Sequence, residues 1–224
     1  MLYSTASVSF RAPRIAAALL IPLWAAFAQT PLPELRTEPV GGGSTFTVRN
    51  VASQPLTGFL IELVNYPGSS YSFWQDTLSH EPLPAGGEQR IQVTNMTVGA
   101  VPDYVKIQAA LYADGTSSGI PEKVAQLIER RRFSLETLGK LVDVLEKAQS
   151  ADKPKASVVA ELKQWADSLQ PAGKTKRDSQ PAINQAAARG LVADAAASLD
   201  THTLEETLAL LHTAERRGSH LAAR

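Results

Sequence analysis

The most regular alternation of apolar and polar residues in the chain lies in Val105-Lys-Ile-Gln-Ala-Ala-Leu-Tyr112. The odd-numbered residues of this stretch are apolar and fall on one face of an extended segment, while Lys106 and Gln108 fall on the other. A period of two predicts a β-strand with one face against a core and the other toward solvent. Asp114-Gly115 follows and predicts a turn that ends the strand.

Shorter stretches before residue 105 show related patterns, and turn-forming residues such as Ala52-Ser-Gln-Pro55 and Leu83-Pro-Ala-Gly-Gly-Glu88 separate them. We therefore expect further strands at 45–51, 57–64, 71–74 and 89–94. Short strands that alternate with turns at this spacing are typical of an antiparallel sandwich. The sequence thus predicts a β-sandwich over residues 29–115.

From residue 116 to residue 224 the period changes to that of an α-helix, and we expect about four to five helices there. The first runs over 121–132, the second begins at Ser134, the third begins near Asp152, the fourth covers 181–199, and Thr203-Leu-Glu-Glu206 is a capping box that opens the fifth. We expect a polar linker near 170–180.

Several details of this helical region are open to test. The leucine stripe of the second helix must be covered by another helix, by the sandwich or by a partner. Its members include Leu135, Leu138 and Leu145. The fourth helix is rich in alanine, so we expect weak packing and mobility, and Gly218 is expected to end the fifth.

The stretch Asn50-Val-Ala-Ser-Gln-Pro-Leu-Thr-Gly-Phe-Leu-Ile-Glu62, the connector Leu83-Pro-Ala-Gly-Gly-Glu88 and the closing strand resemble bacterial extracellular immunoglobulin-like domains over about residues 35–115. The cysteine pair that joins the two sheets of antibody domains is absent. The change of period predicts an α+β chain in two parts, and the resemblance implies that the antiparallel β-sandwich before the helices is immunoglobulin-like. It also implies adhesion, scaffolding or protein binding, without fixing a ligand.

Residues 1–28 have the composition of a secretory signal peptide. Arg11 and Arg14 precede an apolar run from Ile15, and the run ends in Ala26-Phe27-Ala28. The alternative is a membrane anchor, but the 14 residues from Ile15 to Ala28 fall short of the roughly 20 that a spanning helix needs. We expect cleavage between Ala28 and Gln29, and a periplasmic or extracellular chain that does not span the membrane.

The composition disfavours several classes of function. The absence of cysteine excludes disulfides, thiolate metal sites and a cysteine nucleophile. Equal numbers of Lys+Arg and Asp+Glu, 22 of each, disfavour a nucleic-acid partner. Gly41-Gly-Gly-Ser44 precedes a strand rather than a helix, so it does not indicate a phosphate loop, and the four histidines show no zinc-binding spacing. We predict no catalytic residue, cofactor or metal.

Two groups of residues are candidates for binding a partner. Arg130, Arg131 and Arg132 form a cationic run that suits an anionic partner, and the alternative is a helix end paired with Glu129 and Glu136. The second group consists of aromatic residues around a turn. Its members are Tyr66, Tyr71 and Trp74, with Phe73 beside them, and the alternative for Phe73 and Trp74 is a place in the sandwich core.

These features favour a secreted, non-catalytic protein that binds a protein partner or acts as a scaffold at the cell envelope. One alternative is a module that binds a glycan or the cell wall, which needs an exposed aromatic platform made by residues such as Tyr66, Tyr71 and Trp74. Another is a hydrolase with an unrecognised site, which needs a deep pocket with convergent carboxylates.

Overall fold

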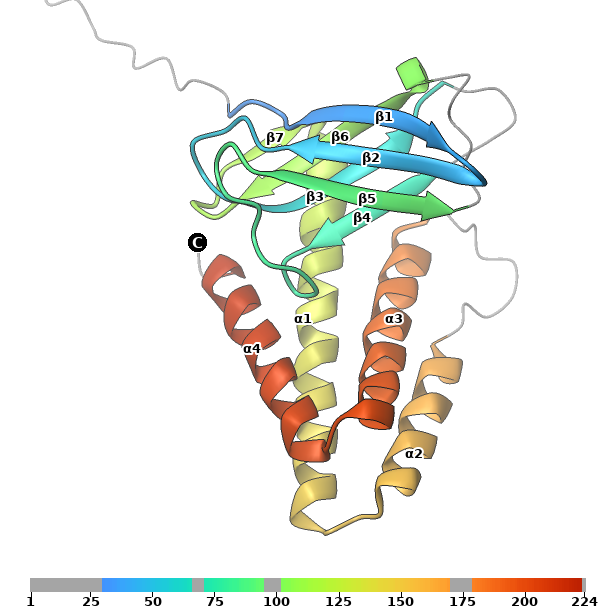
Figure 1. Cartoon of the computed structure of the whole chain (residues 1–224). Coiled ribbons are helices and arrows are strands. Elements are labelled where there is room, and N and C mark those ends of the chain that lie inside the picture. The colour runs from blue at the N-terminus through green and yellow to red at the C-terminus, as the bar shows by residue number, and fades with distance from the viewer. Residues whose placement is uncertain (1–29, 66–70, 95–101, 170–178, 223–224) are drawn as a thin grey trace, which may run out of the picture.

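The chain consists of two antiparallel β-sheets followed by four α-helices, within the residues that the structure describes (Figure 1). The structure is a computed structural model and describes residues 30–65, 71–94, 102–169 and 179–222. The predicted signal peptide and most of the predicted linker lie outside these residues. None of the described helices combines the length and the apolar character that crossing a membrane requires.

The first sheet, sheet A, has the strand order β1-β2-β5. Its strands are β1 (Glu34–Val40), β2 (Gly43–Arg49) and β5 (Glu88–Thr94). Phe46 and Val48 of the central strand β2 are fully buried. Because β1 and β5 are edge strands with many exposed residues, the apolar contribution of this sheet to the core comes mainly from β2.

The second sheet, sheet B, has the order β4-β3-β6-β7. Its strands are β3 (Leu56–Leu63), β4 (Ser72–Asp76), β6 (Val105–Tyr112) and β7 (Ser117–Gly119), and a 3-10 helix (Pro102–Tyr104) precedes β6. The core between the sheets contains Phe46 and Val48 from sheet A and Phe59, Ile61 and Tyr112 from sheet B. The predicted two-part α+β layout, with an antiparallel β part first, is therefore confirmed.

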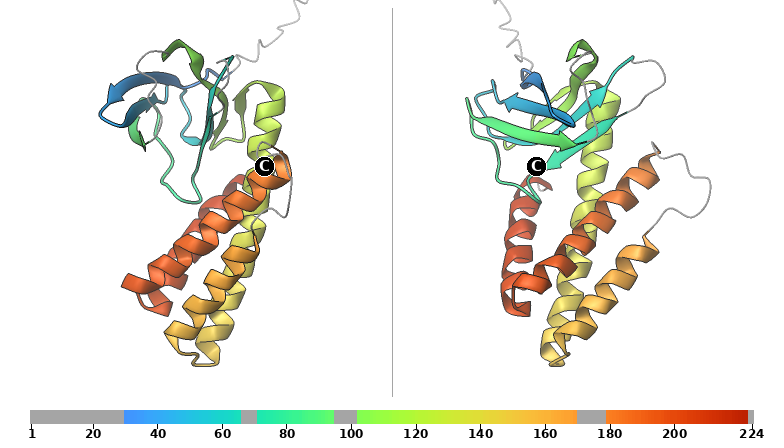
Figure 2. Two further views of the ribbon diagram at one scale, coloured as in Figure 1. Left: turned by 90° about the vertical axis from the view of Figure 1, so that its right-hand side faces the viewer. Right: turned by 45° about the vertical axis from the view of Figure 1, so that its right-hand side comes forward.

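The outer face of sheet B is covered by α1 (Pro121–Ser150), whose first half runs along the sheet (Figure 2). Leu60, Ala109 and Leu111 of the sheet form one apolar cluster with Leu127 of the helix. The expected break before Ser134 is wrong, because α1 is continuous through this position. Ser134 is buried, with 6% of its surface exposed, so it lies within the packed face of the helix rather than at a helix start.

The remaining helices lie below the sheets, where the third and fourth helices pack against α1 and the second packs against the third (Figure 2). They are α2 (Lys155–Ser168), α3 (Gln180–Thr201) and α4 (Leu204–Ala222). The expectation of weak packing for α3 is wrong, because Ala188, Val192 and Leu199 are buried and the helix contacts α1 and α2. Leu138 and Leu145 of the predicted leucine stripe are fully buried within the chain.

The capping box at the start of α4 is confirmed. The Thr203 backbone N–H donates to Glu206 Oε2 at 2.8 Å, and the Glu206 backbone N–H donates to Thr203 Oγ1 at 3.2 Å. Gly218, in contrast, does not end the helix, which continues to Ala222. A Cβ atom on Gly218 would lie 2.3 Å from Leu135 Cδ2 and 2.6 Å from Leu78 Cδ2, so this glycine permits close packing of α4.

Candidate binding groove

The three consecutive arginines of α1 have three different environments. Arg131 is buried, and its Nε donates to Asp76 Oδ2 of β4 at 2.7 Å. Its Nη2 also donates to the Thr57 carbonyl of β3 at 2.9 Å. A Cβ atom on Gly58 would lie only 2.8 Å from Nη2, so this position of β3 leaves room for the guanidinium. Arg131 therefore attaches α1 to sheet B.

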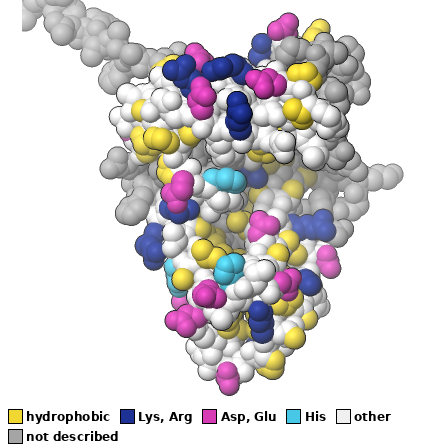
Figure 3. Space-filling view, in the orientation of Figure 1, with side chains coloured by type: hydrophobic (Ala, Val, Ile, Leu, Met, Phe, Trp, Pro, Cys, Tyr) yellow, Lys and Arg dark blue, Asp and Glu magenta, His cyan; other side chains and the backbone are white. Residues whose placement is uncertain are grey.

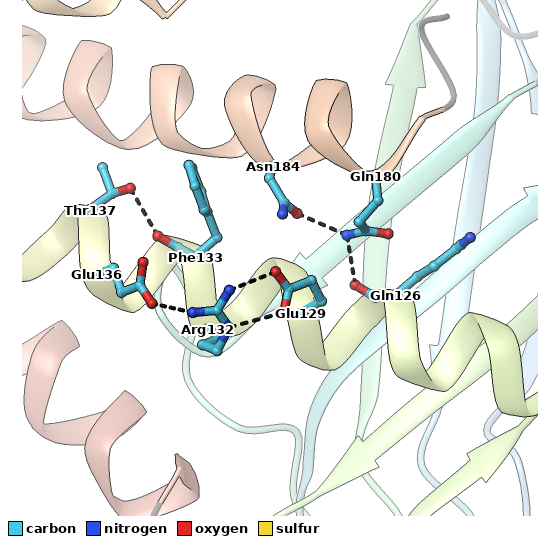
Figure 4. A network of polar contacts seen from close by, with 8 residues as sticks. All are labelled: Gln126, Glu129, Arg132, Phe133, Glu136, Thr137, Gln180 and Asn184. Carbon is cyan, nitrogen blue, oxygen red and sulfur yellow. Dashed lines mark hydrogen bonds and ion pairs between the residues drawn. The ribbon is translucent and has the colours of Figure 1, made fainter.

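Arg132 lies on the surface of α1, with 58% of its side chain exposed. It forms ion pairs with Glu129 and with Glu136 of the same helix (Figure 4). The hydrogen bond from Arg132 lowers the pKa of the Glu129 carboxyl. Both acidic partners are the expected ones and satisfy the guanidinium locally, but Arg132 lies in the middle of α1 rather than at the expected helix end.

Arg130 is half-buried and stacks on an aromatic ring. Its Cζ atom lies 5.3 Å from the centroid of the Trp74 ring, within the range of a cation–π interaction. Burial lowers the pKa of Arg130, and the charge of Asp76 opposes this shift. Among the described residues, no hydrogen-bond acceptor or carboxylate lies within bonding distance of its guanidinium.

The residues of the predicted aromatic group pack against different partners, although Tyr71 and Trp74 both line one groove. Tyr71 packs edge-on against Phe46 of sheet A, with 6.4 Å between the ring centroids, and burial raises the pKa of the Tyr71 hydroxyl. Phe73 likewise lies near Phe59 in the core. Trp74 belongs instead to the apolar cluster that contains Leu127 of α1. Tyr66 lies outside the described residues.

A groove of about 690 Å³ lies between sheet B, α1 and α3. The sheet contributes Glu62, Ser72, Trp74 and Gln108, and α1 contributes Lys123, Gln126 and Arg130. The wall on α3 is apolar and consists of Ala182, Ile183, Ala186 and Ala187. Lys123 Nζ and Glu62 Oε1 form an ion pair at 2.8 Å across the junction of α1 and the sheet.

A smaller notch of about 170 Å³ continues the groove. It lies between α1, α3 and the connection that follows β4, and it shares four lining residues with the groove: Trp74, Arg130, Ala186 and Ala187. On the side seen in Figure 3, the surface between α3 and α4 is hollowed below the β part. The stacked Arg130 and Trp74 therefore lie where the two cavities meet.

The N-terminal end of α3 is held against α1 by side-chain hydrogen bonds (Figure 4). Gln180 Nε2 donates to the Gln126 carbonyl of α1 at 3.2 Å and to Asn184 Oδ1 of α3 at 2.8 Å. Ala182 is buried in the same turn. The first turn of the apolar wall is thus fixed relative to α1, while the small side chains of the following turns leave space beside the sheet.

Comparison with family models, curated proteins and solved structures gives no match. Within the described ranges, no group of three or more His, Cys, Asp or Glu residues is arranged to hold a metal ion. The residues that line the groove therefore provide the evidence for which chemical groups it can bind.

Of the predicted site residues, the structure brings together Arg130, Trp74 and Tyr71 in the lining of the groove, and it places Arg131 and Arg132 elsewhere. Sequence reasoning missed the α3 wall. The signal was present as a run of alanines, but small side chains predict weak packing and do not show which face will line a cavity.

Proposed function

We propose that this chain is an exported, non-catalytic protein that binds an extended segment of a partner protein at the cell envelope. The observation that carries the proposal is the groove itself, because sheet B and two helices all contribute to its lining. Neither part of the chain makes the cavity alone. The helical region thus serves to complete a binding site beside the sheet, and the partner segment lies in the groove and in the notch.

The lining suits a protein segment because its two sides differ in character. The α3 wall offers Ala182, Ile183 and Ala186 to apolar side chains, whereas Gln126 and Arg130 of α1 offer hydrogen-bond donors to polar groups. An extended chain presents successive side chains to opposite sides, so one segment meets both walls at once.

Glycan binding has less support from the same contacts. A sugar-binding platform needs flat aromatic faces that are open to solvent. Arg130 covers a face of Trp74, and Tyr71 packs against Phe46. We therefore treat binding of a glycan as an outcome that tests the proposal rather than as a second function.

The grouping of strands supports an immunoglobulin-like identity for the β part. If strands β1 to β7 are given the letters A to G, strands A, B and E form the first sheet. Strands C, F and G form the second sheet together with the fourth strand, D. The same two groups of three occur in immunoglobulin domains. The fourth strand pairs with C here, whereas it pairs with E in the constant-type arrangement. Such sandwiches commonly act in binding, which agrees with the proposed role.

Export is the second element of the proposal and can be tested separately. We expect fractionation of the source cells to recover the chain outside the cytoplasm, with Gln29 as its first residue. A chain that is recovered in the cytoplasm with Met1 to Ala28 intact would contradict export, whatever the groove binds.

The binding role is tested by photo-crosslinking from inside the groove. A photoreactive residue replaces Ala186, which is exposed and lines the groove, and a matched variant carries it at Ala197, which is exposed on the same helix and lines neither cavity. We expect one discrete protein adduct in intact cells from position 186 and none from position 197. Equal adducts from both positions, or adducts that glycosidases remove, would contradict the proposal.

A further inference from the structure

We infer that Arg130 binds a carboxylate of the partner segment, so that the groove selects extended peptides with an acidic side chain next to apolar ones. This inference rests on the proposed function and names the chemistry of its site. It is drawn from the contrast between Arg130 and the other cations around it.

The neighbouring cations each have an acidic partner within the chain. Arg131 is paired with Asp76, Arg132 with Glu129 and Glu136, and Lys123 with Glu62. The charge of Asp76 acts on Arg130, but the Asp76 carboxylate is bonded elsewhere. Its Oδ2 accepts from Arg131, and its Oδ1 accepts from the Leu78 backbone N–H at 3.2 Å. The Arg130 guanidinium is thus left without an acceptor among the described residues.

The environment of the Arg130 guanidinium favours binding of an acceptor from a ligand. A guanidinium has several N–H donors in a rigid plane, and withdrawing it from water without acceptors is unfavourable. Burial lowers the pKa of Arg130 for this reason. Stacking on Trp74 fixes the plane before the ligand arrives, so a carboxylate finds a fork of donors that is already oriented.

The rest of the lining determines what surrounds that carboxylate. Arg130 lies where the groove and the notch meet, so a segment that passes from one to the other extends on both sides of it. Ala186 and Ala187 of α3 line both cavities. Their methyl groups favour apolar side chains next to the acid and leave room for them, which distinguishes a peptide from inorganic phosphate or an acidic polysaccharide.

The inference is tested with a library of random displayed peptides, selected in parallel on the purified wild-type protein, on Arg130→Gln and on Arg132→Gln. Arg132 is the matched control because it is exposed and lines neither cavity. We expect peptides with Asp or Glu at one fixed position from the wild type and from Arg132→Gln, and loss of this preference with Arg130→Gln. Circular dichroism verifies that each variant is folded.

The possible results distinguish the preference of Arg130 for an acidic residue from peptide binding by the groove. Enriched peptides without an acidic position, or an unchanged acidic preference with Arg130→Gln, would overturn the inference and leave the peptide-binding function in place. Absence of any enriched peptide from the wild type would overturn both. Binding of polygalacturonate or inorganic phosphate that depends on Arg130, in place of peptides, would also overturn it.

A selected peptide then permits a quantitative test. We expect Arg130→Gln to weaken binding by at least about tenfold, and Arg130→Lys to weaken it less, because lysine keeps the charge but lacks the planar fork. Changing the acidic peptide residue to its amide weakens binding to the wild type by the same factor, but has little effect on binding to Arg130→Gln. Independent effects of the two changes would contradict direct pairing, and Arg130→Lys keeps the test valid if Arg130→Gln does not fold.

Discussion

At the scale of single residues, one guanidinium joins the two parts of the chain. Arg131 reaches from α1 to Asp76 and Thr57, which belong to two neighbouring strands of sheet B. Only 9% of the Arg131 side chain and 12% of the Asp76 side chain are exposed, so each charge depends on the other for solvation. Removing one partner of a buried pair leaves the other charge uncompensated.

We therefore predict that Arg131→Gln and Asp76→Asn each lower the free energy of unfolding by about 3–5 kcal/mol. The two changes together should cost less than the sum of the single changes, because the double variant leaves no lone charge. Urea denaturation measures all three. Arg132→Gln serves as the control and should leave the midpoint unchanged, because Arg132 is exposed. A loss that is the same for Arg131→Gln and Arg132→Gln would contradict the assigned role.

At the scale of elements, the glycines of the helices differ in what they permit. Side-chain atoms of Leu78 and Leu135 occupy the space that a Cβ atom on Gly218 of α4 would need. Nothing lies within 4 Å of a Cβ atom on Gly139 of α1. Gly218→Ala should therefore destabilise the protein by about 1–3 kcal/mol through overpacking. Gly139→Ala should stabilise it by about 0.5–1 kcal/mol, since alanine favours the helix. Thermal unfolding compares the two, and shifts of the same sign would be inconsistent with this packing.

The capping box of α4 makes a pH-dependent contribution to stability. Hydrogen bonds from the Thr203 backbone N–H, and then from its hydroxyl, lower the pKa of the Glu206 carboxyl. A lowered pKa means that the contribution is present above the ordinary pKa of glutamate and is lost as the pH falls through the lowered value. We predict that Glu206→Gln unfolds at a lower temperature than the wild type at neutral pH, and that the difference disappears in strong acid. A difference that is independent of pH would refute this account.

Most elements could be predicted from the sequence, and the exceptions have physical causes. Strands β2, β3 and β6 can be predicted because their sequences alternate apolar and polar residues or are densely apolar. β1 is an edge strand with charged residues, and β7 is only Ser117–Gly119, so neither has an apolar signal. The capping box can be predicted because it is formed by residues close together in the sequence. The continuity of α1 could not be predicted, because the burial of Ser134 involves residues that are distant in the sequence.

The candidate site was less predictable than the fold. The sequence marks Arg130, Arg131 and Arg132 as equivalent, because it shows three identical residues. They differ through partners that are distant in sequence, namely Asp76 for Arg131 and Trp74 for Arg130. Long-range pairing of this kind is decided by how sheet B and α1 are packed together, and no local pattern encodes it.

At the scale of the whole molecule, α1 joins the two parts into one unit. Its first half contributes Leu127 to the cluster on sheet B, and its second half contributes Leu141 and Leu145 to the core of the helices. We predict one cooperative thermal transition in calorimetry, with equal calorimetric and van't Hoff enthalpies. Two separate transitions in the wild type would show that the parts are not coupled through α1.

The central claim is that the groove between sheet B, α1 and α3 holds a protein segment. It is tested most directly by titrating a selected peptide into isotope-labelled protein and recording amide and indole shifts by NMR. We expect the largest changes at the Trp74 indole, along β4 and over Ala182–Ala187, with none along α2. Changes confined to β1, β2 or α2 would contradict the claim.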